Sequence, residues 1–347
     1  MTGVPRKGLV GGVALAVSVA LAACSSASST GSSSTAGGSG TSTASAAQST
    51  SASSGNGALT NVVVGAPALT VAVPVYVAQK EGFFKKNGLN VTIDKLASLQ
   101  YVDNALLSGK YDISVSTAPG VIVTAHAGLH LVTVAGNTIN TSSGSGQLGV
   151  EVLRSSGITS LSQLAGKSVG VAQVNGNVNI GFEYKMAKLG VTNVHYTTML
   201  YPSMQSELDA GRVAAVEAAT PFIAKFSPSK YRDLGDPFLF LPTVPNLSAV
   251  WISNTTWANS HATAIKEYQN ALREARSYMA AHPSIIPTEI QAISGVSAAI
   301  AAASAKVMPT FKFSVTPQAF APWLQAMEVI SPGVYNSVKL SSLVVGG

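Results

Sequence analysis

Short apolar runs alternate with helix-like segments from about Leu59 onward, and this alternation predicts an α/β protein with largely parallel sheets. In the first half of this region the predicted strands are 62–64, 91–93, 113–115 and 131–135. Helices are expected over 74–80, over 104–107, and from Pro119 to about Ala127. A proline suits the first turn of a helix because its missing N–H would have no partner there.

A second set of elements follows the first. Strands are predicted over 169–171, 195–198 and 213–216. A polar loop over 173–179 leads into a helix that ends near Leu189, and further helices are expected over 204–210 and from Pro221. Near the end of the chain one helical face collects Ile265, Tyr268, Leu272 and Met279, and Pro283 is expected to stop that helix.

The two sets repeat one another weakly. Gly109-Lys110 and Gly211-Arg212 each precede a predicted strand, and a proline, Pro119 or Pro221, stands ten residues after each of the two glycines. Gly65 and Gly170 likewise end the first strand of each set, and the two offsets are 102 and 105 residues. We interpret the repeat as two lobes of similar construction, one after the other.

The amino terminus follows a different pattern. Arg6 and Lys7 precede an uncharged apolar stretch, 8–23, which is shorter than the roughly 20 residues of a membrane-spanning helix and typical of a signal-peptide core. The stretch ends in Leu21-Ala22-Ala23-Cys24, which resembles the bacterial lipobox, and Cys24 is the only cysteine in the chain. We expect residues 1–23 to be a lipoprotein signal peptide and Cys24 to be lipidated; the alternative is an ordinary signal peptide.

Residues 25–57 contain only Ser, Thr, Ala, Gly, Gln and Asn, so this stretch has no large apolar side chain to bury. With the lipidated cysteine, residues 24–57 are expected to form a disordered linker that tethers the folded part to the membrane.

The composition excludes several classes of function. Only 10% of the residues are charged and the formal net charge is +6, which argues against a nucleic-acid binder. A single cysteine allows neither a disulfide framework nor a cysteine-based metal site. The five histidines are scattered, and no Ser-His-acid, metal or phosphate-loop motif is present. We therefore expect no catalytic residues, no metal and no cofactor.

Four segments resemble the solute-binding proteins of ABC importers, in particular those that serve nitrate, taurine, alkanesulfonates and thiamine-pyrimidine precursors. They are Val73 to Ile93 (VPVYVAQKEGFFKKNGLNVTI), Leu106 to Ser114 (LLSGKYDIS), Ile158 to Val171 (ITSLSQLAGKSVGV) and Leu208 to Pro221 (LDAGRVAAVEAATP). The resemblance covers about residues 59–240. It implies a two-lobe periplasmic-binding-protein-like fold, in which each lobe is a mixed, largely parallel sheet flanked by helices and the ligand cleft lies between the lobes.

The resemblance also implies an organisation and a set of partners. Lobe 1 is expected over 59–145 and 250–347 and lobe 2 over 150–243, with hinges at about 146–152 and 243–251. The expected partners are a small-molecule solute, the permease and ATPase subunits of an importer, and the membrane through the lipid anchor. The protein is expected to act as an extracytoplasmic monomer on the bacterial cell membrane.

Candidate ligand residues follow from the geometry of open parallel sheets. The carboxyl ends of such strands meet helix amino termini, where unpaired N–H groups hold an anion without Lys or Arg. Residues that follow the predicted strands or stand beside them are the candidates: Thr70, Val71, Tyr76, Thr117, Ala118, Asn137, Asn175, Gly176, Asn177, Glu217, Thr220 and Trp251.

Each type of candidate also has a purely structural explanation. Thr117 and Thr220 equally fit helix N-caps, and Asn175 and Asn177 equally fit turns. The aromatic candidates fit the core as well as a ligand wall, and Glu217 fits an exposed turn as well as the cleft.

The charge of the solute stays open at this level. No Lys or Arg lies in the four candidate loops, so a doubly charged anion, which usually recruits arginine, is disfavoured. A sulfonate or carboxylate, a zwitterion such as taurine with Glu217 taking the ammonium, and a neutral heterocycle all fit. The sequence favours a tethered receptor for a sulfonate-like or taurine-like solute. The alternatives are a thiamine-pyrimidine-precursor receptor and a sensing lipoprotein without a transport role.

Overall fold

Two β-sheets organise the described part of the chain, which comprises residues 58–96, 98–141 and 146–346 of this computed structural model. These residues lie within one compact unit, Gly55–Gly347. The predicted signal peptide, the predicted lipidation site Cys24 and the predicted linker lie outside the described residues.

The first sheet has six strands in the order β11-β4-β10-β3-β1-β2. Its strands are β1 (Thr60–Pro67), β2 (Leu89–Leu96), β3 (Ile113–Thr117), β4 (Leu131–Asn140), β10 (Asn246–Asn254) and β11 (Thr310–Phe311). Strand β1 pairs in parallel with β2 and β3, whereas β10 runs antiparallel between β3 and β4. A returning strand from late in the chain therefore completes a sheet that the early strands begin.

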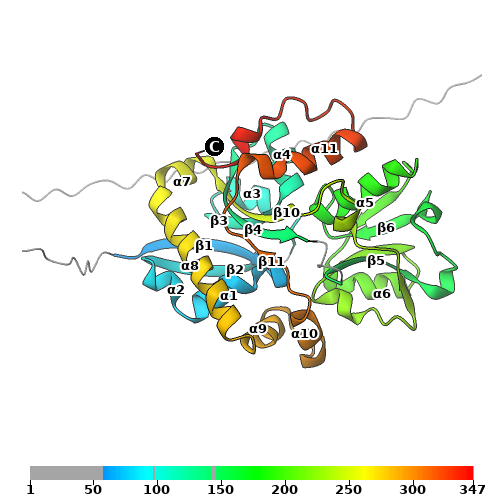
Figure 1. Cartoon of the computed structure of the whole chain (residues 1–347), viewed down its shortest axis with the longest axis horizontal. Coiled ribbons are helices and arrows are strands. Elements are labelled where there is room, and N and C mark those ends of the chain that lie inside the picture. Colours follow the sequence, from blue (N-terminus) through cyan, green and yellow to red (C-terminus); the bar gives the residue numbers. More distant parts are fainter. Residues whose placement is uncertain (1–57, 97, 142–145, 347) are drawn as a thin grey trace, which may run out of the picture. The chain divides into compact units, whose positions relative to one another are not determined.

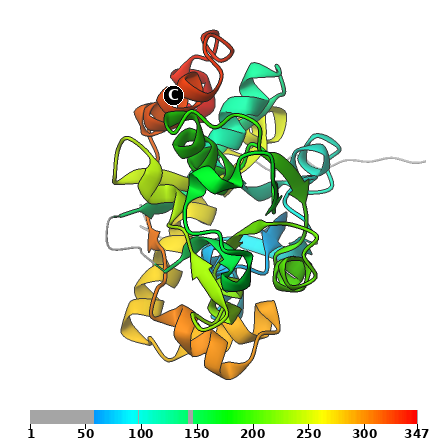
Figure 2. The same cartoon turned by 90° about the vertical axis from the view of Figure 1, so that its right-hand side faces the viewer.

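The second sheet repeats this arrangement with five strands in the order β7-β6-β8-β5-β9. Its strands are β5 (Leu148–Leu153), β6 (Ser168–Val171), β7 (His195–Thr198), β8 (Ala215–Ala219) and β9 (Tyr231–Asp233). Strand β6 pairs in parallel with β7 and β8, and β5 runs antiparallel between β8 and β9. We use lobe 1 for the first sheet and lobe 2 for the second, each with the helices that connect its strands (Figures 1 and 2).

Helices flank both sheets. They are α1 (Val73–Lys80), α2 (Phe83–Lys86), α3 (Val102–Leu107), α4 (Ala118–His126), α5 (Asn177–Lys188), α6 (Met204–Asp209), α7 (Thr255–Ser260), α8 (Ala262–Ala281), α9 (Ile285–Ser294), α10 (Ala298–Ala305) and α11 (Ala321–Ile330). Short 3₁₀ turns add η1 (Thr70–Ala72), η4 (Tyr201–Ser203), η5 (Phe222–Lys225) and η6 (Pro237–Phe240).

Most predicted elements of the first two thirds are confirmed, although several extend beyond their predicted bounds, and three elements of lobe 2 differ in other ways. Helix α5 begins at Asn177, inside the segment predicted as loop. Strand β8 begins at Ala215, two residues later than predicted. Pro221 leads only into the short turn η5, because Pro228 follows closely and the residue before a proline disfavours helical geometry. The expected hinge ranges also contain strand residues, since 148–152 belongs to β5 and 246–251 to β10.

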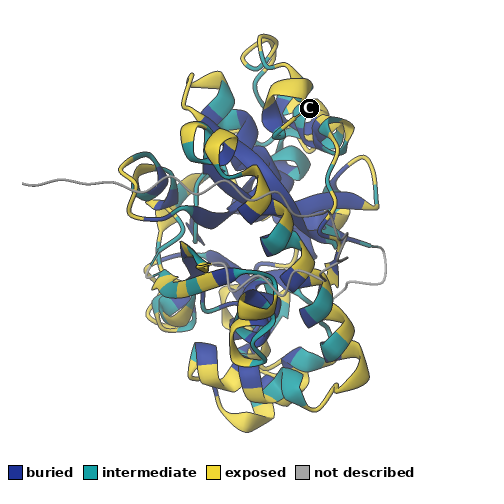
Figure 3. Ribbon diagram, turned by 90° about the vertical axis from the view of Figure 1, so that its left-hand side faces the viewer, coloured by how far each residue is buried: buried dark blue, intermediate teal, exposed yellow. Residues whose placement is uncertain are grey.

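The largest core cluster lies between the first sheet and the helices α1 and α8. Trp251 of β10 is fully buried there and meets the ring of Tyr268 edge-on, with 5.7 Å between the ring centroids. Phe84 stacks on the same tyrosine at 5.5 Å. Figure 3 shows buried residues concentrated in the strands and exposed residues on the outer helix faces. The apolar face of α8 predicted from the sequence is therefore its contact with lobe 1.

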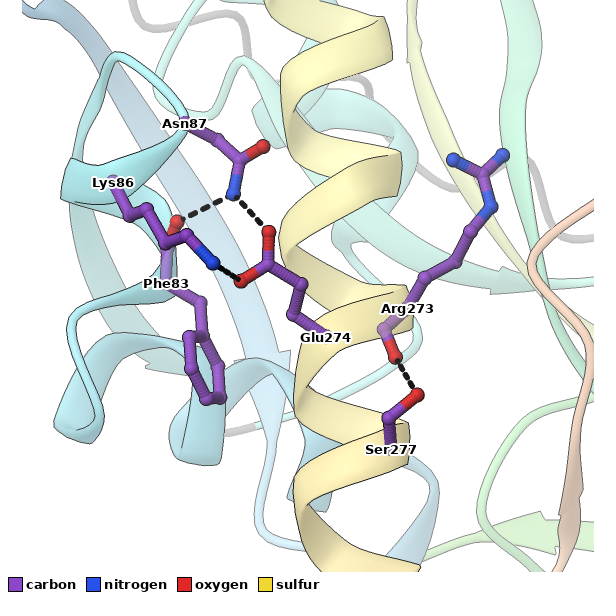
Figure 4. Close-up of polar contacts among 6 residues, drawn as sticks. All are labelled: Phe83, Lys86, Asn87, Arg273, Glu274 and Ser277. Atoms are coloured by element: carbon purple, nitrogen blue, oxygen red, sulfur yellow. Dashed lines mark hydrogen bonds and ion pairs between the residues drawn. The ribbon is translucent and has the colours of Figure 1, made fainter.

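Polar contacts fix α8 against α2 as well (Figure 4). Glu274 of α8 accepts from Lys86 Nζ at 2.7 Å and from Asn87 Nδ2 at 3.1 Å. Asn87 also donates to the carbonyl oxygen of Phe83 at 2.9 Å, which closes the end of α2. These contacts hold α8 to α2 on the outer side of lobe 1.

The chain crosses between the two sheets twice, once between β4 and β5 and once between η6 and β10. The two crossings are joined by a side-chain hydrogen bond, from Asn140 Nδ2 to Asn246 Oδ1 at 2.6 Å. A second core cluster spans both lobes beside them, with Leu148, Ala219 and Phe238 packed against residues that include Trp323. The junction therefore has a packed apolar side as well as the two strand crossings.

Candidate functional site

A cavity of about 70 Å³ lies between the two lobes, at the carboxyl ends of their parallel strands. Pro67 ends β1, Thr117 ends β3, and Ala219 ends β8 on the opposite side. The geometry of open parallel sheets predicted a site at this edge. The lining polar side chains are Thr70, Ser116, Thr117, Thr138, Asn140, Gln147, Gln173, Asn177, Tyr201, Thr220 and Ser248.

Two pairs of residues form hydrogen bonds across the cavity from one lobe to the other. Thr70 Oγ1 and Thr220 Oγ1 are 2.7 Å apart, and both side chains are buried. Asn177 Nδ2 of lobe 2 donates to Ser248 Oγ of strand β10 at 2.8 Å. Thr70, Asn177 and Thr220, which the sequence placed in three separate loops, thus each bond to a residue of the opposite lobe.

Helix starts surround the same cavity. Thr117 Oγ1 accepts from the Gly120 N–H at 3.1 Å and so caps α4, while its side chain also lines the cavity. Thr70 and Val71 belong to the turn η1, which leads into α1, and Asn177 is the first residue of α5. The positive ends of these helices and turns therefore face the cavity and favour an electron-rich group there.

Two side-chain amides are free to bind a ligand. Gln147 and Gln173 line the cavity from lobe 2, are half-buried, and make no recorded side-chain hydrogen bond with the described residues. The sequence identified Gln173 only as part of a loop and did not identify Gln147. It also missed Thr138, Asn140 and Ser248, which come from strands whose position at the cavity depends on the tertiary fold.

The lining carries no full charge among the described residues. Tyr201 is the only ionisable side chain in it, and burial, with a smaller contribution from Glu217, raises the pKa of its hydroxyl well above 10. The side chains therefore offer hydrogen bonds and apolar walls, and they supply neither a guanidinium for a strong anion nor a carboxylate for an ammonium group.

Five of the predicted residues line the cavity: Thr70, Val71, Thr117, Asn177 and Thr220. Seven lie outside its lining: Tyr76, Ala118, Asn137, Asn175, Gly176, Glu217 and Trp251. Tyr76 packs against the core of lobe 1, and burial raises the pKa of its hydroxyl to about 12. Trp251 is fully buried in the centre of the first sheet.

Some of the seven support the cavity from behind. Asn137 is fully buried and donates from Nδ2 to the carbonyl oxygen of Val71 at 3.0 Å. Asn175 has a φ of 61°, in the left-handed region that asparagine tolerates, and Gly176 is the N-cap of α5. Ala118 is buried at the start of α4. These residues shape the turns that present Val71, Asn177 and Thr117.

Glu217 lies beneath α5 rather than on the cavity wall. Its side chain is 2% exposed, and Asn179 Nδ2 of α5 donates to its Oε1 at 3.4 Å. Burial raises the pKa of its carboxyl well above the usual value. Asn179 in turn accepts from the Asn175 N–H at 3.0 Å. This position does not provide the ammonium partner that a taurine-like solute would need.

The described residues contain neither a metal-binding cluster nor a membrane-spanning helix. Residues 58–96, 98–141 and 146–346 hold no group of three or more His, Cys, Asp or Glu side chains arranged to bind a metal ion. Within the same ranges, no helix combines the length and the apolar character that a membrane crossing requires.

Solved structures share this fold along most of the chain. The periplasmic aliphatic sulphonate binding protein SsuA from Escherichia coli has a TM-score of 0.66 at 15% identity, covering 82% of this chain and 97% of that one. The alkanesulfonate-binding protein SsuA from Xanthomonas axonopodis pv. citri, bound to MOPS, has a TM-score of 0.69 at 14% identity, covering 83% of this chain and 97% of that one. The periplasmic nitrate-binding protein NrtA from Synechocystis PCC 6803 has a TM-score of 0.68 at 14% identity, covering 83% of this chain and 86% of that one. The predicted two-lobe fold is confirmed.

Sequence comparison gives a nearer relationship. A putative thiamine biosynthesis protein from Haemophilus influenzae is 29% identical over 222 residues, which is 60% of this chain. The chain spans 65% of the length of that curated relative. The NMT1/THI5-like family matches residues 70–285, well over half of the chain. The predicted resemblance is confirmed, and the chain belongs to the NMT1/THI5-like family.

Proposed function

We propose that the protein is the extracytoplasmic solute-binding component of an ABC importer. The observation that carries the proposal is the interlobe cavity, which both lobes line with uncharged hydrogen-bonding groups. Family membership and the fold shared with sulfonate-binding and nitrate-binding proteins support a role in binding rather than catalysis. The proposed partners are the permease and ATPase subunits, and the proposed active form is a monomer.

The chemistry of the lining favours a neutral nitrogen heterocycle of the aminopyrimidine class. Each free amide, Gln147 and Gln173, offers both a donor and an acceptor, which suits a ring that carries an amino group and ring nitrogens. No lining side chain of the described part of the chain supplies the positive charge that a strong anion recruits. The name of the relative from Haemophilus influenzae, a putative thiamine biosynthesis protein, supports the same class.

A singly charged sulfonate is the second candidate. The amino ends of α4 and α5, beside Thr117 and Asn177, carry the positive pole of a helix dipole, which favours one negative charge without a cation. The two SsuA proteins with the same fold bind sulfonates by their names. Taurine is less favoured than an alkanesulfonate because Glu217, the predicted partner of its ammonium, lies outside the cavity.

A thermal-shift panel on the purified protein tests the proposal. It compares aminopyrimidines with alkanesulfonates, taurine, nitrate and carboxylates. A ligand at 100 times its Kd raises the unfolding free energy by about 2.7 kcal/mol, which gives a clear shift in Tm. We expect the largest shift from an aminopyrimidine. A shift from sulfonates alone would establish the second candidate, and no shift from any member would contradict the receptor role for these solute classes.

Ligand capture is proposed to involve lobe movement about the two crossings, near 146–152 and 243–251. In this account lobe 1 comprises 59–145 with 250–347, and lobe 2 comprises 150–243. The Asn140–Asn246 hydrogen bond joins the crossings and supports a pivot there. Small-angle scattering is expected to show a smaller radius of gyration with a saturating ligand. Superimposable curves would contradict lobe movement.

Membrane tethering through Cys24 is the remaining part of the proposal. It rests on the sequence Leu21-Ala22-Ala23-Cys24 and on the Ser/Thr/Gly-rich stretch that follows. The variant Cys24→Ala is expected to be released from the membrane fraction of a producing bacterium. Equal retention of Cys24→Ala and the wild type would contradict lipidation at this residue.

A further inference from the structure

A second cavity, of about 240 Å³, adjoins the first. The two share Pro67, Leu69, Leu99 and Tyr201 in their linings. The second cavity also lies between the lobes, since it is lined by the ends of β1 and β2 on one side and by Ala172, which follows β6, on the other. The residues that line it are Pro67, Ala68, Leu69, Lys95, Leu96, Ser98, Leu99, Ala172, Met199, Leu200, Tyr201, Pro202, Phe222 and Ser294.

The second cavity differs from the first in chemistry. Its lining has no side-chain amide among the described residues, and its wall is made of apolar groups such as Leu96, Met199 and Leu200. The rings of Tyr201 and Phe222 stack at a centroid distance of 6.4 Å, with an angle of 1° between their planes. One edge of the shared wall is therefore aromatic. The hydrogen-bonding cavity and the larger apolar one are therefore neighbours with four lining residues in common.

Among the described residues that line the second cavity, only Lys95 carries a full charge. It is exposed, and no ion pair to a described carboxylate is recorded for it. An exposed ammonium interacts weakly with a partner because water and salt screen it. The apolar walls, rather than Lys95, therefore dominate the character of this chamber.

We propose that the solute has two parts, a hydrogen-bonding head in the first cavity and an apolar arm of several carbons in the second. This inference rests on the proposed function and narrows its substrate class. A head alone would leave the larger chamber filled with water against Leu96, Met199 and Phe222. Burying each methylene of an arm there is worth about 0.8 kcal/mol, which corresponds to about fourfold in affinity.

Matched ligands test the proposal by titration calorimetry. One pair is 4-amino-2-methylpyrimidine and the same ring with a butyl group at carbon 5. The other pair is methanesulfonate and pentanesulfonate. Neutral arms are used so that attraction to Lys95 does not contribute. For the head that binds, we expect the arm to raise the affinity at least about tenfold.

Leu200→Trp locates the arm. Leu200 lines the second cavity and is 50% exposed, so an indole at this position is expected to fill the chamber without disturbing the core. Leu189→Trp is the matched control, because Leu189 is 46% exposed in lobe 2 and lines none of the cavities described above. We expect Leu200→Trp to abolish the gain from the arm while the short ligand binds as before, and Leu189→Trp to preserve the gain.

The outcomes separate the two proposals. Short ligands that bind with no gain from the arm, or a gain that survives Leu200→Trp, would overturn the two-part solute and leave the receptor role intact. No binding by any of the four ligands would overturn the proposed solute classes and the two-part solute together.

Discussion

The two lobes are built on the same plan and differ in what they bury. Strands β1, β2, β3, β10 and β4 of lobe 1 occupy the places of β6, β7, β8, β5 and β9 in lobe 2, with the same parallel and antiparallel pairings. The weak repeat in the sequence thus corresponds to a real repeat of topology. The repeat extends to the turns, since the Asp112 N–H donates to Val63 O in lobe 1 and the Ala214 N–H donates to Ser168 O in lobe 2.

The difference lies in buried carboxyl groups. Lobe 2 buries Glu151, Glu217 and Asp236, and no ion pair is recorded for any of them among the described residues. In the part of the chain that packs on lobe 1, the buried acid Glu289 pairs with Lys80, and the sheet itself buries hydroxyl groups such as Ser114 and Ser253. The comparison shows that one topology accepts two kinds of buried polar group, and that only lobe 2 is expected to depend strongly on pH.

The direction of that dependence follows from the pKa values. Burial, and the nearby Asp233 to a smaller extent, raise the pKa of Glu151 to about 8. Burial is also the first cause that raises the pKa of Asp236 to about 7 and that of Glu183 to about 7. The folded state therefore holds more protons than the unfolded state. The contribution that these protonated carboxyl groups make to the unfolding free energy is fully present below about pH 4.5. It is lost as the pH rises towards 8.

The largest expected effect is that of Glu151→Gln at alkaline pH. Glu151 pairs across the sheet with Asp233, so its ionised form is both buried and opposed by a like charge. Glutamine keeps the shape and removes the charge. We expect it to raise the unfolding free energy at pH 9 by on the order of 4 kcal/mol and to change it little at pH 5. Denaturant unfolding at both pH values measures this.

Glu274→Gln is the control for that experiment. Glu274 is on α8 against lobe 1, and its hydrogen bond with Lys86, followed by that with Asn87, lowers its pKa. The Glu274→Gln variant is therefore expected to show no increase in unfolding free energy at pH 9. Equal stability of Glu151→Gln and the wild type at pH 9 would show that lobe 2 does not bury an unfavourable carboxylate, and the contrast between the lobes would fail.

A smaller effect is expected from Asp112→Ala in lobe 1. Asp112 Oδ2 accepts from the Val63 N–H at 2.8 Å, and alanine leaves that partly buried donor without this acceptor. We expect a loss of about 1 to 3 kcal/mol in the unfolding free energy. Asp112→Asn keeps an acceptor oxygen and is expected to lose less. If the alanine and asparagine variants have the same unfolding free energy, the hydrogen bond from the Val63 N–H to the side chain at position 112 does not contribute to stability.

The smallest effect is expected from the reciprocal change in lobe 2. Ala214 occupies the position of Asp112 in the repeat, and its main chain makes the equivalent hydrogen bond. Ala214→Asp is expected to supply the missing acceptor and to raise the unfolding free energy by at most about 1 kcal/mol. A rise in Tm would show that the two turns are interchangeable. A lower Tm would show that the two turns share only their main-chain hydrogen bond and not a place for the aspartate side chain.

Local pattern predicted those parts of the fold that depend on neighbouring residues. The strands through Val64, Ile113 and Val171 are short apolar runs, and each lies in a sheet. Strand β10 was missed as an element, because its place between β3 and β4 depends on pairing with residues more than 100 positions away. The same long-range pairing brings Ser248 into the cavity.

The sequence predicted the candidate site only in outline, because local pattern locates the ends of strands but not the side chains that face the cavity. Residues at strand ends, such as Thr70 and Thr220, could be found from the rule for open sheets. The rule does not say which side of a strand each residue faces. Glu217 stands three residues before Thr220, but α5 covers its side of β8. Gln147 precedes a strand that the sequence did not predict, so no local signal marked it.

The measurement that tests the account most directly is a calorimetric titration of an aminopyrimidine into Gln147→Ala and Gln173→Ala. Each variant removes one free amide from the cavity lining, and each is expected to weaken binding by about three- to tenfold. Glu217→Gln is the control, because it substitutes a neutral amide for a buried carboxyl outside the lining, and its affinity should match that of the wild type. The account would be contradicted if Gln147→Ala and Gln173→Ala both bound as the wild type does while Glu217→Gln bound more weakly. That result would place the binding site near Glu217.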